Sequence, residues 1–368
     1  MSYTHLNQRL RVLPLEKRES KTSIAEIAVN PDFPPPTAGK HLNKIKSIAE
    51  RMRQARENGA AIILAFGAHL VKNGLAPLVI RMMEEGWLTH LATNGAGGIH
   101  DWEFAWLGRS EEDVRANVAM GQFGTWEETG RCINLAVQIG SSHGKGYGES
   151  LGALIYNEHL DVPTIDSLKN DLLSNIDTND TTLAAKLDLL QNLRALDTKS
   201  GAQHIPHKMK HYSLLGNAYR LGLPITVHPG IGYDIIYNSP YALGAALGRA
   251  AHIDYHKMVA SILELTDGVF LSVGSAIMAP QIFEKALSFA NNLRLQESRS
   301  IISNHSLVVN DLQESAWDWT QGEPPKSSPD YYLRFLKSFY RMGGNVFYIA
   351  ADNRLFLHNL YYQLKSNN

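Results

Sequence analysis

Cysteine is almost absent from this sequence of 368 residues, which holds only Cys132. A single cysteine cannot form an intrachain disulfide or a cysteine-rich zinc site, and its scarcity fits a reducing compartment. Long apolar runs are also missing. No stretch approaches the roughly 18 residues of a transmembrane helix, and the polar N-terminus has no signal-peptide core. We therefore expect a soluble cytoplasmic protein that binds no membrane and no metal ion.

An excess of either charge is missing as well. The chain has 35 Lys and Arg against 36 Asp and Glu, a formal net charge of -1. Without a positive field or a basic patch, binding to nucleic acid or to an anionic membrane is not expected. A hydrophobic content of 44% with 29 Gly and 15 Pro is instead typical of a globular protein with a large core.

Short apolar segments recur along the chain and alternate with segments of helical periodicity. The apolar segments are rich in Ile, Leu, Val and Ala, as strands buried on both faces are. They span residues 60–70, 87–98, 221–232, 267–276, 299–309 and 344–353, and the helical segments include 41–58, 74–86, 254–265 and 280–294. This alternation predicts a doubly wound, mostly parallel, Rossmann-like α/β fold.

The alternation is interrupted in two places. Residues 1–41 are expected to form an N-terminal arm, because the proline-rich segment 30–40 cannot continue a helix. Residues 161–220 are polar and rich in Asn, Asp, Lys and Leu, which predicts an inserted helical pair. We therefore expect an arm followed by a single α/β domain, residues 42–368, that carries this insertion.

A glycine-rich turn follows the second predicted strand. In open α/β sheets ligands bind beyond the carboxyl ends of the strands, so the residues after each strand are the informative ones. The segment Thr93–Asp101 (TNGAGGIHD) contains three glycines, which would let the backbone approach a phosphate at a helix start. The same segment is equally compatible with a tight strand-to-helix turn in which Asp101 caps the helix.

A second turn of small residues, Leu271–Ser275, ends the strand predicted at 267–276. Two such turns in one sheet favour a dinucleotide ligand. Close packing of the helix over 280–294 explains the second turn equally well, so both interpretations stay open.

Titratable side chains follow other strands. His228 and Asp234 stand at one strand end. A histidine beside a carboxylate suits acid–base catalysis, because its pKa lies near neutrality, but it also suits a structural hydrogen bond. Lys337 lies among apolar neighbours, where a lowered pKa would make it a nucleophile for imine formation. The alternative for Lys337 is a side chain that extends to solvent.

Four segments, taken in order, resemble the deoxyhypusine synthase family, which uses NAD to move the aminobutyl group of spermidine onto a protein lysine. These segments are residues 63–101, 223–236, 266–276 and 346–361. The resemblance runs from about residue 60 to the C-terminus and is interrupted at 161–220. It implies NAD as cofactor, a homotetramer, a small-molecule amine substrate and a protein lysine as acceptor.

The resemblance also implies the residues of the site. Asp234 would bind the amine and Lys337 would be the nucleophile, with His228 and His305 as further catalytic candidates. The implied NAD contacts are His69, Asn94, Gly95, Ala96, Gly97, Gly98, Asp101, Ser272, Val273, Gly274, Asn304 and Asp352.

One departure from the family bears on the substrate. Where the family has Lys-His-His after its glycine turn, this chain has Ile277, Met278 and Ala279. Because such polar groups set specificity, the departure weakens the spermidine assignment more than the NAD assignment. We expect an NAD-dependent transferase of the deoxyhypusine synthase type that acts on an amine or amino-acid-like substrate. An NAD-recycling lyase or cyclodeaminase and a non-catalytic NAD-binding protein remain as alternatives.

Overall fold

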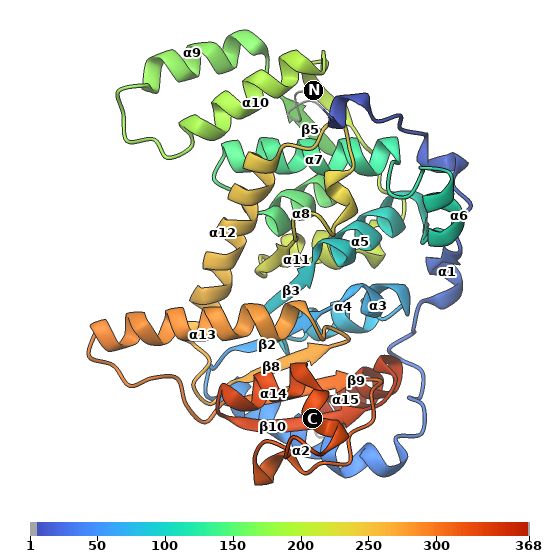
Figure 1. The fold of residues 1–368 in the computed structure, drawn as a ribbon, viewed down its shortest axis with the longest axis vertical. Coiled ribbons are helices and arrows are strands. Elements are labelled where there is room, and N and C mark those ends of the chain that lie inside the picture. The colour runs from blue at the N-terminus through green and yellow to red at the C-terminus, as the bar shows by residue number, and fades with distance from the viewer. Residues whose placement is uncertain (1–5, 367–368) are drawn as a thin grey trace. The chain divides into compact units, whose positions relative to one another are not determined.

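The computed structural model describes residues 6–366 and divides into two compact units, which we treat separately (Figure 1). Unit 1 comprises residues up to 27 and residues 98–254, and unit 2 comprises residues 28–97 and those from 255 onward. The segment 1–41 is shared between the two units, and the expected single domain is divided as well.

Unit 2 contains a parallel sheet. Its strands are β2 (Ile62–Phe66), β3 (His90–Asn94), β8 (Val269–Val273), β9 (Ser306–Asp311) and β10 (Asn345–Ala350). Within this unit they lie in the order β10-β9-β8-β2-β3, and every neighbouring pair is parallel. In β2, Leu64 lies opposite Leu91 on one side and Leu271 on the other. β2 and β8 are buried along their whole length, which explains their unbroken apolar sequences.

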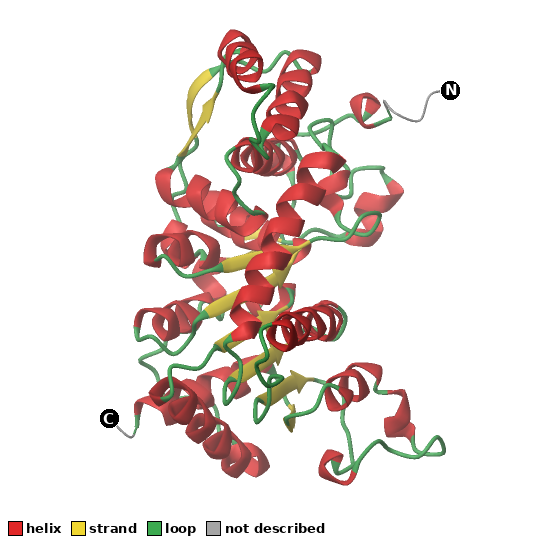
Figure 2. Cartoon of the chain, turned by 90° about the vertical axis from the view of Figure 1, so that its left-hand side faces the viewer, coloured by secondary structure: helices red, strands yellow, loops and turns green. Residues whose placement is uncertain are grey.

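Helices cover both faces of this sheet (Figures 1 and 2). One face carries α2 (Leu42–Glu57), α4 (Ala76–Glu84) and α15 (Asn353–Lys365), while the short α3 (Ala68–Lys72) follows β2. The other face carries α13 (Met278–Gln296), α14 (Arg334–Arg341) and the C-terminal part of α12 (Gly244–Leu263). Phe270, Phe283 and Phe339 lie at the centre of this second layer, with ring centroids 4.5–6.0 Å apart.

The predicted α/β class with a parallel sheet is confirmed. Along the chain, β3 is added on one side of β2, whereas β8, β9 and β10 are added on the other. The direction of winding therefore reverses between β2 and β8. In open α/β sheets the crevice at such a reversal is the usual position for a ligand.

Unit 1 is mainly helical. α7 (Glu127–Ser142), α8 (Tyr147–Asn157) and α11 (Leu214–Leu221) pack together, with α8 and α11 also against β7 (Ile225–His228). The segment 161–220 contains α9 (Ile165–Asn175) and α10 (Leu183–Ala195), which pack against each other. It also contains β6 (Gly201–His204), which pairs antiparallel with β5 (His159–Val162).

The N-terminal segment is anchored to its own chain. β1 (Thr22–Ser23) pairs with β4 (Arg109–Ser110). Three helices not yet named are α1 (Ile24–Ile27), α5 (Gly95–Leu107) and α6 (Val114–Ala119). Arg18 forms a bidentate ion pair with the buried Glu103, at 2.8 and 2.7 Å. In unit 2, the carbonyl groups of Phe33 and Pro36 bind His358 and Asn359 of α15. No helix within residues 6–366 has both the length and the apolar character to cross a bilayer.

Candidate functional site

Two glycines meet at the carboxyl edge of the unit 2 sheet, where the winding reverses. Gly67 follows β2 and Gly274 follows β8. The Gly67 N–H donates a hydrogen bond to the Val273 carbonyl (3.2 Å), and the Gly274 N–H donates one to the Asn310 carbonyl (3.0 Å). These bonds extend the pairing beyond the strands and hold the two turns side by side.

The local backbone requires both glycines. A Cβ on Gly67 would lie closer than 3.0 Å to the carbonyl oxygen of Gly274, so a side chain is excluded there. Gly274 has a φ of 57°, and an ideal Cβ on it would meet no heavy atom within 4 Å. Gly67 is therefore explained by close packing of two turns. Gly274 leaves open space beside the backbone, which is what a phosphate-bearing ligand needs.

The glycine-rich turn after β3 is part of a helix. α5 begins directly at Gly95, and the Asn94 Oδ1 accepts a hydrogen bond from the Gly97 N–H (2.8 Å), so Asn94 caps the helix. The Thr93 hydroxyl donates to the Phe66 carbonyl (3.0 Å) and ties this turn to β2. The start of α5 therefore lies at the same edge of the sheet as the two glycines.

Asp101 does not belong to this edge. It lies in unit 1, where its carboxylate accepts hydrogen bonds from the Ser213 hydroxyl (2.5 Å) and from the N–H groups of Leu214 (2.7 Å) and Leu215 (3.1 Å). These groups form the N-terminus of α11, so Asp101 caps that helix and not α5. Burial raises the pKa of Asp101 to about 6 in spite of these hydrogen bonds. Gly98 also lies in unit 1, packed against β7.

Ser272 and Val273, two further expected cofactor contacts, directly precede Gly274. Both lie inside β8 and are buried, at 2% and 0% exposure. Their side chains pack within the sheet layers, so only the next residue, Gly274, reaches the edge.

Asn310 is a residue of this edge that was not predicted from the sequence. Its side chain is buried, and its Nδ2 donates to the carbonyls of Ile349 (3.1 Å) and Ala351 (2.8 Å). Its Oδ1 has no hydrogen-bond partner in the described part of the chain. A buried acceptor left unsatisfied costs about 1–3 kcal/mol, so a donor from a ligand or a water is expected here. The sequence signal is an Asn that ends an apolar run, SLVVND.

His69 and Asp352 lie after the strands of this edge. His69 is exposed on α3, and desolvation together with Lys72 lowers its pKa, while Asp311 raises it. The Asp352 carboxylate accepts a hydrogen bond from the Arg354 N–H (2.8 Å) and caps α15. This capping bond involves Oδ1 alone, so it is compatible with a ligand contact at the other carboxylate oxygen.

Asn304 and His305 lie at the opposite edge of the sheet. β9 begins only at Ser306, because Asn304 has a left-handed backbone with a φ of 55° and so interrupts the extended chain. The Asn304 amide binds Asp267, which precedes β8. His305 is buried against Phe283, and burial lowers its pKa to about 4. The expectation that these residues lie at a ligand-binding strand end is therefore wrong.

Lys337 has a structural partner. It lies on α14, and its Nζ is 3.8 Å from the ring centroid of Tyr331. A cation over an aromatic face is a stabilising arrangement in its own right. This contact accounts for Lys337 without a role as nucleophile.

His228 and Asp234 lie in unit 1 with a third polar residue. The His228 Nε2 is 2.9 Å from the Thr226 hydroxyl, and the Asp234 carboxylate accepts a hydrogen bond from the Gly230 N–H (2.6 Å). Tyr147 of α8 is fully buried, and burial together with the charge of Asp234 raises its pKa. Its hydroxyl has no hydrogen-bond partner within residues 6–366. Tyr147 was not predicted, because in the sequence it stands only as part of a glycine-rich turn.

No group of three or more metal-binding side chains converges in the described part of the chain.

No protein-family model and no curated protein matches the sequence. Three of the solved structures to which the chain is similar are apo ArgZ, an arginine dihydrolase from the ornithine-ammonia cycle in cyanobacteria; AgrE in a ternary complex with ornithine and NAD+; and a putative LOR/SDH protein from Methanococcus maripaludis S2.

The similarity to these structures is low. ArgZ is 14% identical with a TM-score of 0.41, AgrE 12% with 0.41, and the LOR/SDH protein 16% with 0.40. The matches cover 89%, 90% and 96% of this chain. The chain spans only 33% of ArgZ and 34% of AgrE, against 74% of the LOR/SDH protein.

The expected membership of the deoxyhypusine synthase family is wrong. The structural neighbours are ArgZ, AgrE and the LOR/SDH protein, and none of these is a deoxyhypusine synthase. The physical reason is that strand ends with Gly, Asn and Asp occur in parallel α/β sheets generally, so the motifs indicated the fold and not the family. The transferase assignment is withdrawn with it.

Proposed function

We propose that this chain is an NAD-dependent enzyme that acts on a small amino-acid-like substrate. The reaction we propose is of the lyase or cyclodeaminase type, in which the cofactor regains its starting redox state in each turnover. The observation that carries the proposal is the turn after β8. Gly274 leaves open space at the point where the winding reverses, and its N–H is bonded to Asn310, which has a buried, unsatisfied amide oxygen.

The residues at this edge fit a dinucleotide in two further respects. Gly95 and Ala96 form the first turn of α5, which has 13 residues and whose positive end favours a phosphate. The Asn310 Oδ1 is an acceptor that suits a ribose hydroxyl or a carboxamide N–H. When bound, NAD would accept and return a hydride, while the protein supplies binding and orientation.

The proposed cofactor contacts are a corrected subset of the expected ones. We keep the residues that lie at the carboxyl edge and add the one that the sequence analysis missed. They are His69, Asn94, Gly95, Ala96, Gly97, Gly274, Asn310 and Asp352.

The catalytic roles of His228 and Asp234 stay predictions. A carboxylate such as that of Asp234 suits a substrate ammonium group, and a histidine such as His228 suits proton transfer near neutral pH. Lys337 is left out, because its ammonium group lies over the Tyr331 ring.

A turnover assay tests this function. Ornithine, the amino acid in the AgrE complex, is the first substrate to try. The purified protein should release ammonia from it only when NAD is present, and NADH should not accumulate in proportion to product. His228→Gln should lower kcat at least tenfold with NAD affinity unchanged, whereas the exposed His211→Gln in the same unit serves as control. NADH formed in step with product contradicts a recycled cofactor.

A further inference from the structure

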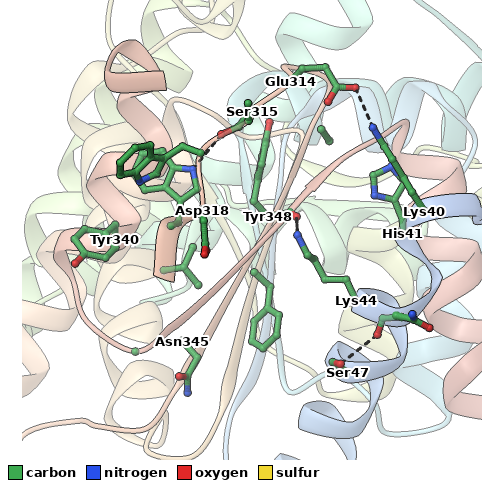
Figure 3. A pocket seen from close by; sticks show the side chains of 18 residues that line it. Lys40, His41, Lys44, Ser47, Glu314, Ser315, Asp318, Tyr340, Asn345 and Tyr348 are labelled. Atoms are coloured by element: carbon green, nitrogen blue, oxygen red, sulfur yellow. Dashed lines mark hydrogen bonds and ion pairs between the residues drawn. The ribbon is translucent and has the colours of Figure 1, made fainter. Parts of the chain in front are cut away.

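A pocket lies along β10, in unit 2. Its volume is about 1000 Å³, within the range of small-molecule sites. One wall comes from the start of α2 and the 3-10 helix before it, Gly39–His41, and the other from the segment 314–319 and the end of α14. Figure 3 shows Lys40, His41 and Lys44 on one side and Asp318 and Tyr340 on the other, with Tyr348 between them.

None of the residues that line this pocket is among the proposed cofactor contacts, although one of those contacts, Asp352, follows β10. β10 is the last strand of the sheet, two strands beyond β8. At a spacing of about 4.8 Å between strands, it lies roughly 10 Å from the point of reversal. A ligand in this pocket would therefore be an addition to the proposed NAD site.

The α2 wall is cationic. The Lys44 Nζ donates a hydrogen bond to the Tyr348 carbonyl (2.9 Å), which fixes the ammonium group over the floor of the pocket. An ammonium group has three donors, so further donors can bind an anion. Lys40 adds a second positive charge, which an exposed contact with Glu314 at 3.8 Å balances only weakly.

The opposite wall is aromatic and carries two carboxylates, Asp318 and the Glu314 that contacts Lys40. Trp317 lines the pocket, and its Nε1–H is bonded to the Gly322 carbonyl (2.8 Å), so the indole offers no free donor to a ligand. Tyr340 adds a second ring to the lining. Asp318, next to Trp317, accepts a hydrogen bond from Gln321 (3.1 Å) and is an acceptor for an amino group on a stacked ring.

We infer that this pocket binds an anionic ligand with a flat, amino-bearing ring, of the nucleoside monophosphate class. The ring stacks on Trp317 and Tyr340, its amino group donates to Asp318, and the phosphate binds Lys44 and Lys40. Aromatic stacking with a charge-assisted phosphate contact is a general mode of nucleotide binding. The inference does not depend on the proposed enzymatic function, because the pocket and the cofactor edge share no residue.

Calorimetric titration with AMP tests the inference, on the protein alone and on the protein saturated with NAD. We expect one AMP per chain under both conditions, and binding of adenosine at least tenfold weaker because it lacks the phosphate. Lys44→Gln and Trp317→Ala should each weaken AMP at least tenfold, and Trp317→Phe should retain binding. Lys46→Gln is the matched control, because Lys46 is exposed on the same helix but does not line the pocket.

Three results would overturn the inference. They are no AMP binding, equal binding of adenosine and AMP, or AMP affinity unchanged in both Lys44→Gln and Trp317→Ala. NAD affinity should be unchanged in Lys44→Gln. Loss of NAD binding in a variant of the proposed cofactor edge would therefore concern the proposed function. It would leave the inference about this pocket unchanged.

Discussion

The carbonyl oxygen of Gly274 occupies the place that a side chain on Gly67 would need. This relationship joins the turns after β2 and β8, which are neighbours in the sheet although about 200 residues separate them in sequence. It fixes the two turns at the reversal of winding, where the proposed cofactor site lies.

Gly67→Ala should destabilise unit 2 by about 1–3 kcal/mol or more, because the added methyl group overlaps backbone that cannot move without shifting β8. Gly274→Ala is the matched comparison. Its methyl group meets open space, so it carries only the cost of a left-handed backbone, about 1 kcal/mol. Urea unfolding of both variants checks this order, and equal losses would show that the two turns are not in tight contact.

Asp101 should make the protein less stable as the pH rises from about 4 to 6. Its pKa is raised to about 6 in the folded state from 3.8, so between these pH values the folded state binds more protons than the unfolded state. The free energy of unfolding therefore falls as the pH rises through this range, and the stabilising contribution of the protonated carboxyl is lost above it. The shift corresponds to about 3 kcal/mol.

The variant Asp101→Asn removes this ionisation while keeping one acceptor for the N-terminus of α11. Its stability relative to the parent should therefore improve by about 2–3 kcal/mol between pH 4 and pH 7. Urea unfolding at both pH values measures the change. A variant with a lower free energy of unfolding than the parent at pH 7 would show that the ionised carboxylate is the better cap.

His305 should act in the opposite direction. Burial lowers its pKa to about 4 from 6.5, so its contribution is fully present above pH 6.5 and is lost as the pH falls toward 4. Neither ring nitrogen has a hydrogen-bond partner within residues 6–366. His305→Leu should therefore be neutral or stabilising at pH 7.5 and gain up to about 3 kcal/mol over the parent near pH 4. A large loss at pH 7.5 would indicate a partner for the ring.

Much of the fold could be predicted from the sequence, because strands buried on both faces have unbroken apolar sequences. Each predicted strand segment overlaps an observed strand, and five of the six, including those of β2 and β8, contain it completely. The predicted start of the strand at 299–309 is wrong, because Asn304 has a left-handed backbone and β9 begins only at Ser306. That shift of a few residues moved Asn304 and His305 to the wrong edge and hid Asn310.

The site was harder to predict than the fold. Asp101 is a polar residue near a glycine turn, but its partners come from α11, more than 100 residues away, and no local pattern indicates them. The division into two units was also hidden, because two of its boundaries fall inside the continuous helices α5 and α12. Residue patterns report local structure, whereas these features depend on contacts between distant segments.

Native mass spectrometry with NAD tests the central claim most directly. We predict one NAD per chain, and at least tenfold weaker binding in Gly274→Asp, because the new carboxylate enters the open space and repels a phosphate. Gly343→Asp is the matched control: Gly343 also has a positive φ and open space around it, but lies before β10, at the other edge of the sheet. Absence of NAD from the parent protein, or equal NAD binding by the two variants, would contradict a cofactor site at Gly274.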